Sequence, residues 1–165
     1  YPEQLEDTLR ARGTNARVID AGVSGDTSAA GRQRLAFTLD AQDTPPDLVI
    51  LELGGNDMLR GIQPDQTRAN FAAMLEELRA RQIPVLLMGM RAPPNYGTEY
   101  QQRFDALYGE LAREYGARLV PFWLESIFQD PSLFLEDRIH PTAEGVGMLV
   151  GDTLDDVQQA LPAEG

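Results

Sequence analysis

His140 is the only histidine in the chain, and Asp137 precedes it by three residues. In a tight turn the Asp137 carboxylate can accept the imidazole Nδ1–H, set the tautomer and stabilise the imidazolium. Pro141 and Thr142 then begin a predicted helix, which places His140 at a loop–helix junction. The spacing therefore predicts a general base with an acidic partner. The alternative is structural, with Asp137 as a turn residue that pairs with Arg138.

Two glycine-containing loops offer hydrogen-bond donors for an anion. Asn56 follows two glycines, whose backbone freedom would let its amide point at an oxygen that gains charge during a reaction. Gly25 could present its backbone N–H as a second donor. Taken singly, each residue is also consistent with a simple turn. Together with the acid–base pair they form the set used in acyl transfer, without its nucleophile.

These residues lie in loops that follow predicted strands. Apolar runs of strand length predict strands over residues 17–21, 47–53, 84–90 and 118–122. Apolar residues at helical spacing predict helices over residues 2–12, 29–39, 65–81, 100–115 and 142–160. The alternation indicates an α/β fold with parallel strands and right-handed crossovers. In such a sheet the loops at the carboxyl ends of the strands gather at one edge, here residues 22–28, 54–57, 91–97 and 137–141.

Composition narrows the function classes. The 165 residues predict one domain, and 26 acidic against 14 basic residues give a net charge of −12, which argues against a nucleic-acid partner. The absence of cysteine excludes disulfides, cysteine-ligated zinc and thiol catalysis. No apolar run approaches the roughly 20 residues of a transmembrane helix. With one histidine, we expect no metal site at Asp57, Asp137 and His140.

Four sequence blocks resemble those of one known family. They read VIDAGVSGDTS at 18–28, ELGGND at 52–57, RAPPNYG at 91–97 and DRIHP at 137–141. These blocks are similar to those of the SGNH (GDSL-type) hydrolases, and in particular of the bacterial thioesterase I, lysophospholipase and arylesterase group. The resemblance spans essentially the whole chain, and the combination of GGND with DxxHP is specific.

The resemblance implies a fold and an activity. The fold would be a flavodoxin-like three-layer sandwich with a parallel sheet, and the activity the hydrolysis of esters and thioesters without a metal or cofactor. By the same resemblance, Gly25 and Asn56 would form the oxyanion hole. His140 would be the catalytic base, and Asp137 its acidic partner.

The resemblance also implies a substrate class and a cellular location for the protein. Pro93, Asn95 and Tyr96 would contact a small acyl ester, thioester or lysophospholipid. Pro94, Trp123, Phe128 and Phe134 are further candidates for an acyl groove, although aromatic residues near strand ends are as often part of a core. The family resemblance suggests a periplasmic or secreted protein, and we expect a monomer.

The nucleophile block of the family is absent from the chain. Family members begin with a strand that ends in Gly-Asp-Ser-Leu or a close variant, and its serine is the nucleophile. Ser28 ends a similar sequence, Gly-Asp-Thr-Ser, but this sequence belongs to the block that contains Gly25. Ser24, Ser126 and Ser132 have no better position. We therefore expect residues 1–161 to be one hydrolase domain lacking its first, central strand, with 162–165 as a tail.

The sequence is also compatible with two other functions. The first is a catalytically inactive binding module that keeps the fold without the nucleophile. The second is a phosphate or nucleotide binder that uses the glycine loop at 22–25, although the loop has no lysine and no fuller glycine pattern. The residue in the nucleophile position would separate the hydrolase from the binding module.

Overall fold

A parallel sheet of three short strands lies at the centre of the fold. The computed structural model describes residues 1–162, so all but the first residue of the tail expected at 162–165 lies outside them. The strands are β1 (Val49–Leu51), β2 (Val85–Met88) and β3 (Arg118–Val120), in the order β1-β2-β3. Val49 pairs with Val85, and Leu87 pairs with Leu119. The parallel α/β architecture expected from the alternating pattern is confirmed.

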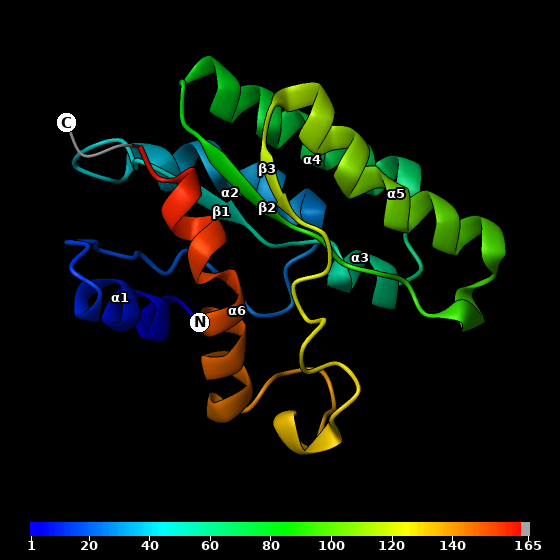
Figure 1. Cartoon of the computed structure of the whole chain (residues 1–165). Helices are drawn as coiled ribbons and strands as arrows, with labels where there is room; N and C mark the ends of the chain where they lie inside the picture. The colour runs from blue at the N-terminus through cyan, green and yellow to red at the C-terminus, as the bar shows by residue number, and fades with distance from the viewer. Residues whose placement is uncertain (163–165) are drawn as a thin grey trace.

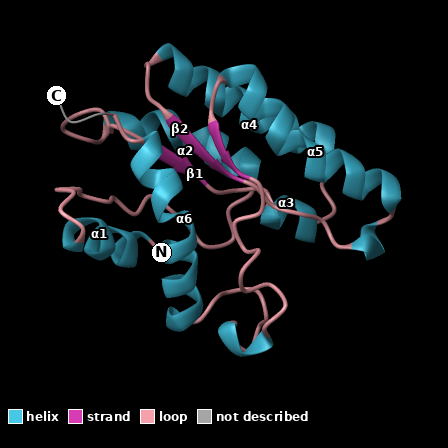
Figure 2. Cartoon of the chain, viewed as in Figure 1, coloured by secondary structure: helices cyan, strands magenta, loops and turns pink. Residues whose placement is uncertain are grey.

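Helices cover both faces of the sheet (Figures 1 and 2). On one face lie α2 (Ser28–Asp40), α4 (Pro64–Ala80) and α5 (Thr98–Tyr115); on the other lie α1 (Pro2–Ala11) and α6 (Ala143–Ala160). Leu87 packs with Phe71 and Phe104 on the first face, whereas Leu86 and Met88 pack with α1 and α6 on the second. Consecutive residues of a strand point to opposite faces of the sheet. Because the residues on both faces are apolar here, a hydrophobic core forms on each side of the sheet.

Local capping explains several of the helix boundaries. Thr27 and Thr142 precede α2 and α6, and their side chains accept hydrogen bonds from the backbone N–H groups of Ala30 and Gly145. Helix α5 ends at Tyr115, and Gly116 after it adopts the left-handed conformation. The helix bounds expected from the sequence are therefore confirmed to within about two residues.

The strand expected at residues 17–21 is wrong. Within residues 1–162, β1 pairs only with β2, and residues 17–21 form an irregular segment. Ile19 is exposed, while the Val18 backbone N–H donates to Glu6 of α1. A groove separates this segment from β1, because residues on both sides line the same cavity. A strand forms only beside a hydrogen-bonding neighbour, and this segment has none within reach.

Three short helices were not expected from the sequence. They are α3 (Gly55–Leu59) and the 3₁₀ helices η1 (Pro94–Tyr96) and η2 (Pro131–Leu133). The first two occupy loops at the carboxyl edge of the sheet. No helix of the described part of the chain is both long and apolar enough to cross a bilayer.

Candidate active site

The loops at the carboxyl edge of the sheet border one large groove. Its volume is about 1990 Å³, and its lining includes Gly25, Asn56, Pro93 and His140. These residues come from all four loops that the sequence places at this edge. The structure thus brings both expected oxyanion donors and the expected base to one groove.

His140 and Asp137 form a close pair in the hairpin before α6. The imidazole Nδ1 lies 2.5 Å from Asp137 Oδ2, and the Asp137 carboxylate also accepts the backbone N–H groups of Ile139 and His140. The hydrogen bond from the His140 side chain, followed by those from the two backbone N–H groups, lowers the Asp137 pKa to about 2. An ionised Asp137 makes Nδ1 the donor, so Nε2 is the nitrogen available as a base.

A buried carboxylate anchors the loop that carries Asn56. Asp57 is fully buried and accepts hydrogen bonds from the Ser28 backbone N–H at 2.7 Å and from Thr67 Oγ1 at 2.8 Å. The Ser28 hydroxyl donates to the same carboxylate. Asp57 therefore joins the start of α2 to α3 and α4, and its carboxylate lies apart from the Asp137–His140 pair. Among residues 1–162, no three acidic, histidine or cysteine side chains gather as a metal site.

Asn56 is hydrogen-bonded to the residue that follows Gly25. Asn56 Nδ2 donates to the backbone carbonyl of Asp26 at 3.1 Å, and Gly25 adopts a φ of 84°. A side-chain amide carries two hydrogens, so this bond fixes the Asn56 rotamer and leaves one hydrogen for a ligand. Asp26 in turn forms an ion pair with Arg34 at 2.8 Å. The sequence analysis missed Asp26 and Arg34 as parts of this arrangement.

Two of the expected substrate-binding residues do not reach the groove. Asn95 and Tyr96 lie on η1 outside its lining, whereas Pro93 contributes to it. Tyr96 stacks on Tyr100 of α5, with ring centroids 5.4 Å apart. This apolar contact places the ring on the outer helical layer.

The serines of the neighbouring loop do not form a catalytic pair. Ser28 is fully buried and hydrogen-bonded to Asp57, so its hydroxyl is part of the anchor described above. Ser24 is exposed and lines the groove. No hydrogen bond joins either serine to His140 in the described part of the chain.

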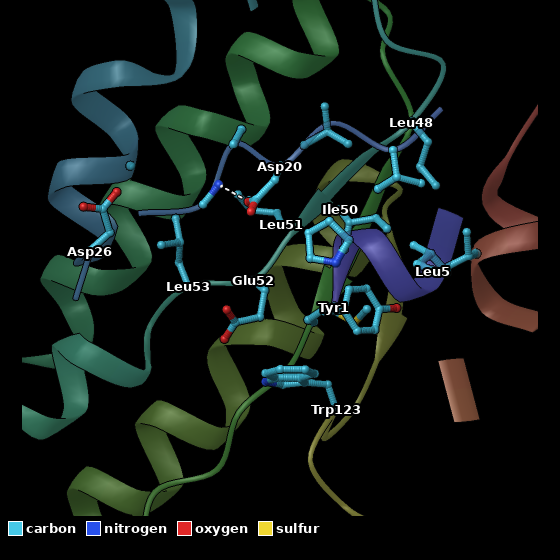
Figure 3. A pocket seen from close by; sticks show the side chains of 18 of the residues that line it. Tyr1, Leu5, Asp20, Asp26, Leu48, Ile50, Leu51, Glu52, Leu53 and Trp123 are labelled. Carbon is cyan, nitrogen blue, oxygen red and sulfur yellow. Dashed lines mark hydrogen bonds between the residues drawn. The ribbon is translucent and has the colours of Figure 1, made fainter. Parts of the chain in front are cut away.

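Glu52 is a further groove residue that the sequence analysis missed. It follows β1, and Figure 3 shows it among the lining residues together with Leu53 and Trp123. The residue is exposed at the groove, yet the protein atoms around its carboxyl remove enough hydration to raise the pKa to about 6. The Trp123 Nε1–H is buried and has no hydrogen-bond partner within residues 1–162. The only signal in the sequence was a single acidic residue near the end of an apolar run.

Comparison with known sequences identifies the family. A sequence profile of the GDSL-like Lipase/Acylhydrolase family matches residues 1–147. The chain belongs to this family. Esterase TesA of Pseudomonas aeruginosa is 43% identical over 137 residues, which is 83% of this chain and 67% of that protein. Thioesterase 1/protease 1/lysophospholipase L1 of Escherichia coli strain K12 is 38% identical over 144 residues, or 87% of this chain and 67% of that protein.

Solved structures of GDSL-like hydrolases share the fold. AlinE4, an SGNH-hydrolase family esterase, is 56% identical and superposes with a TM-score of 0.82, covering 99% of this chain and 86% of that one. The structure of TesA is 38% identical with a TM-score of 0.90, covering 98% of this chain and 88% of that one. The expected family and α/β fold are thus confirmed. As its relatives are named esterases and thioesterases, the protein is a hydrolase of the ester-cleaving type.

Proposed function

We propose that this protein hydrolyses small acyl esters and thioesters by a Ser-His-Asp mechanism. The proposal depends on one observation: His140, which is paired with Asp137, borders the same groove as Gly25 and Asn56. A seryl oxygen would attack the acyl carbonyl, and His140 Nε2 would accept its proton. Gly25 N–H and Asn56 Nδ2–H would stabilise the oxyanion.

The second half of the reaction uses the same residues. The His140 imidazolium donates its proton to the leaving alcohol or thiol, and an acyl-enzyme remains. His140 then takes a proton from water, which attacks the acyl group, and the acid is released as the proton returns to the serine. The ionised Asp137 stabilises the imidazolium in both halves.

The serine, in this proposal, belongs to a segment that precedes Tyr1. The free edge of β1 borders the groove, and the groove exceeds the roughly 300–1,000 Å³ of a small-molecule pocket. A strand of five residues, about 17 Å long, would pair with β1 and bring its carboxyl end to the edge where His140 lies. Residues 1–161 would then form one domain with that strand.

The substrate class follows from the groove and the relatives. Apolar side chains such as Met58, Phe122 and Phe128 line the groove, which suits an acyl chain. The relatives are named thioesterase, lysophospholipase and arylesterase. We therefore propose acyl thioesters, lysophospholipids and aryl esters as the substrates to compare. The monomeric state expected from the sequence stays a prediction.

Covalent labelling tests the mechanism. A serine-directed fluorophosphonate should label the full-length protein once, at a serine before Tyr1, and should not label residues 1–165 alone. Those residues alone should hydrolyse a nitrophenyl ester barely faster than buffer, because loss of a triad nucleophile costs about 10⁶ in kcat. In the full-length protein, His140→Ala should abolish turnover and leave the melting temperature unchanged, since His140 is exposed.

The controls separate this proposal from its alternatives. Ser24→Ala, which removes the serine in the groove, should keep both labelling and turnover. Labelling at Ser24 or Ser28 would overturn the assignment of the nucleophile. A full-length protein that folds, lacks a serine before Tyr1 and hydrolyses nothing would be a binding module instead.

A further inference from the structure

We propose that Arg34 is a positioning residue for the oxyanion hole. Through its ion pair with Asp26, it holds the backbone that orients both Gly25 and Asn56. This inference rests on the proposed function, because it concerns the two donors assigned there. Arg34 itself does not contact the reacting atoms in this proposal.

The ion pair links the donor loop to a rigid element. Arg34 lies on α2, and its Nε donates to Asp26 Oδ2 at 2.8 Å. The Asp26 side chain is only 15% exposed and that of Arg34 33%, so water screens this pair less than the exposed pairs elsewhere on the surface. Figure 3 shows Asp26 at the groove. The helix thereby restrains a residue that directly follows Gly25.

Asp26 contacts both donors through its backbone. Its peptide bond joins it to Gly25, and its carbonyl accepts the hydrogen bond from Asn56 Nδ2. A shift of Asp26 would therefore change the backbone angles of Gly25, which set the direction of its N–H, and would also release the Asn56 rotamer. Gly25 adds little stiffness of its own, because glycine tolerates many backbone angles.

The other side-chain contacts of the loop that contains Gly25 and Asp26 are longer, or they act on a residue other than Asp26. Ser28 is held by Asp57, but two residues further along the chain. Arg60 reaches the Gly25 carbonyl at 3.4 Å from an exposed position, which is a long hydrogen bond. The Arg34 pair is thus the short side-chain contact that acts directly on Asp26.

Charge gives the pair a second effect on the donors. An unpaired Asp26 carboxylate would place a negative charge one residue from the N–H that faces the developing oxyanion. Arg34 compensates that charge at contact distance. Loss of Arg34 should consequently slow the step in which the oxyanion forms and affect substrate binding less.

The test compares Arg34→Gln with Arg34→Lys in the full-length protein. Arg34→Gln should lower kcat by about 10- to 100-fold, less than the 10²–10³ for complete loss of one donor, with KM changed less than about twofold. Arg34→Lys, which restores the charge without the planar guanidinium, should recover part of the loss. Adding Asp26→Asn to Arg34→Gln should cost no more than Arg34→Gln alone, because the contact is already lost and the unpaired charge is removed.

Arg81→Gln is the matched control. Arg81 is 30% exposed and pairs with Asp40 and Glu77 far along α2 and α4, so its loss should leave kcat unchanged. A structural role for Arg34 would lower the melting temperature and leave kcat per folded molecule unchanged, which would overturn the inference.

A second measurement does not depend on turnover. In NMR spectra of the full-length protein, Arg34→Gln should shift or broaden the Gly25 amide and the Asn56 side-chain amide signals, and Arg81→Gln should not. If the unsubstituted protein hydrolyses no ester, the proposed function fails, and these signals alone decide the positioning role. Unchanged signals in Arg34→Gln would refute it in either case.

Discussion

At the scale of single residues, hydrogen bonds rather than burial prepare the acid–base pair. His140 and Asp137 are both largely exposed, yet three donors converge on the Asp137 carboxylate. They lower its pKa to about 2, so Asp137 stays ionised at any pH where the protein would work. A change of activity near neutral pH would therefore not come from Asp137.

Asn56 offers the sharpest test at this scale. If its amide stabilises the oxyanion, Asn56→Ala in the full-length protein should lower kcat by roughly 10²–10³ with little change in KM. A residue that only formed the turn would lower the melting temperature and leave kcat per folded molecule unchanged. Measuring both quantities on one preparation distinguishes the two roles, and Asn95→Ala, outside the groove lining, is the matched control.

At the scale of elements, the turn from β1 into α3 determines where Asn56 lies. Gly54 adopts a φ of 104°, and Tyr108 of α5 packs against it while donating its hydroxyl hydrogen to the Leu53 carbonyl at 2.8 Å. Asp57 anchors the far side of the turn inside the protein. Asn56 is thereby held between two buried contacts and faces the groove on a fixed backbone.

Gly54→Ala tests this turn. The added methyl would overlap the Tyr108 hydroxyl and require a left-handed backbone, so we expect a loss of about 2–5 kcal/mol in the free energy of unfolding. Urea denaturation measures it. Gly61 also has a positive φ but has open space around it. Gly61→Ala should therefore lower the free energy of unfolding only by the cost of the left-handed backbone, about 1–2 kcal/mol.

A rescue variant checks the cause of the Gly54 effect. Combining Gly54→Ala with Tyr108→Phe removes the hydroxyl that the methyl would meet. The double variant should then lose less than the sum of the two single losses. Strictly additive losses would show that the hydroxyl is not the obstacle.

At the scale of the whole molecule, the groove beside β1 divides the fold. It separates β1 from residues 17–21, and Glu52 stands in it with a pKa of about 6. In the unfolded chain this carboxyl titrates near its ordinary value of 4.5. Between these values the folded state binds more protons, so stability is lost as pH rises through about 6.

Glu52→Gln should reveal this loss. In residues 1–165, the melting temperature of the variant should be similar to that of the unsubstituted chain near pH 4.5 and higher at pH 7.5. Glu125→Gln, which removes an exposed carboxyl, is the control for net charge. An equal difference at both pH values would show that Glu52 has no raised pKa.

The sequence by itself determined the local features of this protein. Hydrophobic periodicity and capping residues are local signals, so the five long helices, the parallel class and the strands at 49–51, 85–88 and 118–120 were predictable. The Asp137–His140 pair is three residues apart and follows from its own turn. The position of Gly25 and Asn56 in loops after strands grouped them with that pair, and the family blocks implied the role of each residue.

Only the tertiary structure decided contacts between distant segments. The Asp26–Asn56 and Ser28–Asp57 hydrogen bonds join residues about 30 positions apart, and the raised pKa of Glu52 comes from atoms of several elements. Residues 17–21 have a strand-like sequence, but strand formation depends on a neighbour at hydrogen-bonding distance. Packing partners, which no local pattern encodes, decided each of these outcomes.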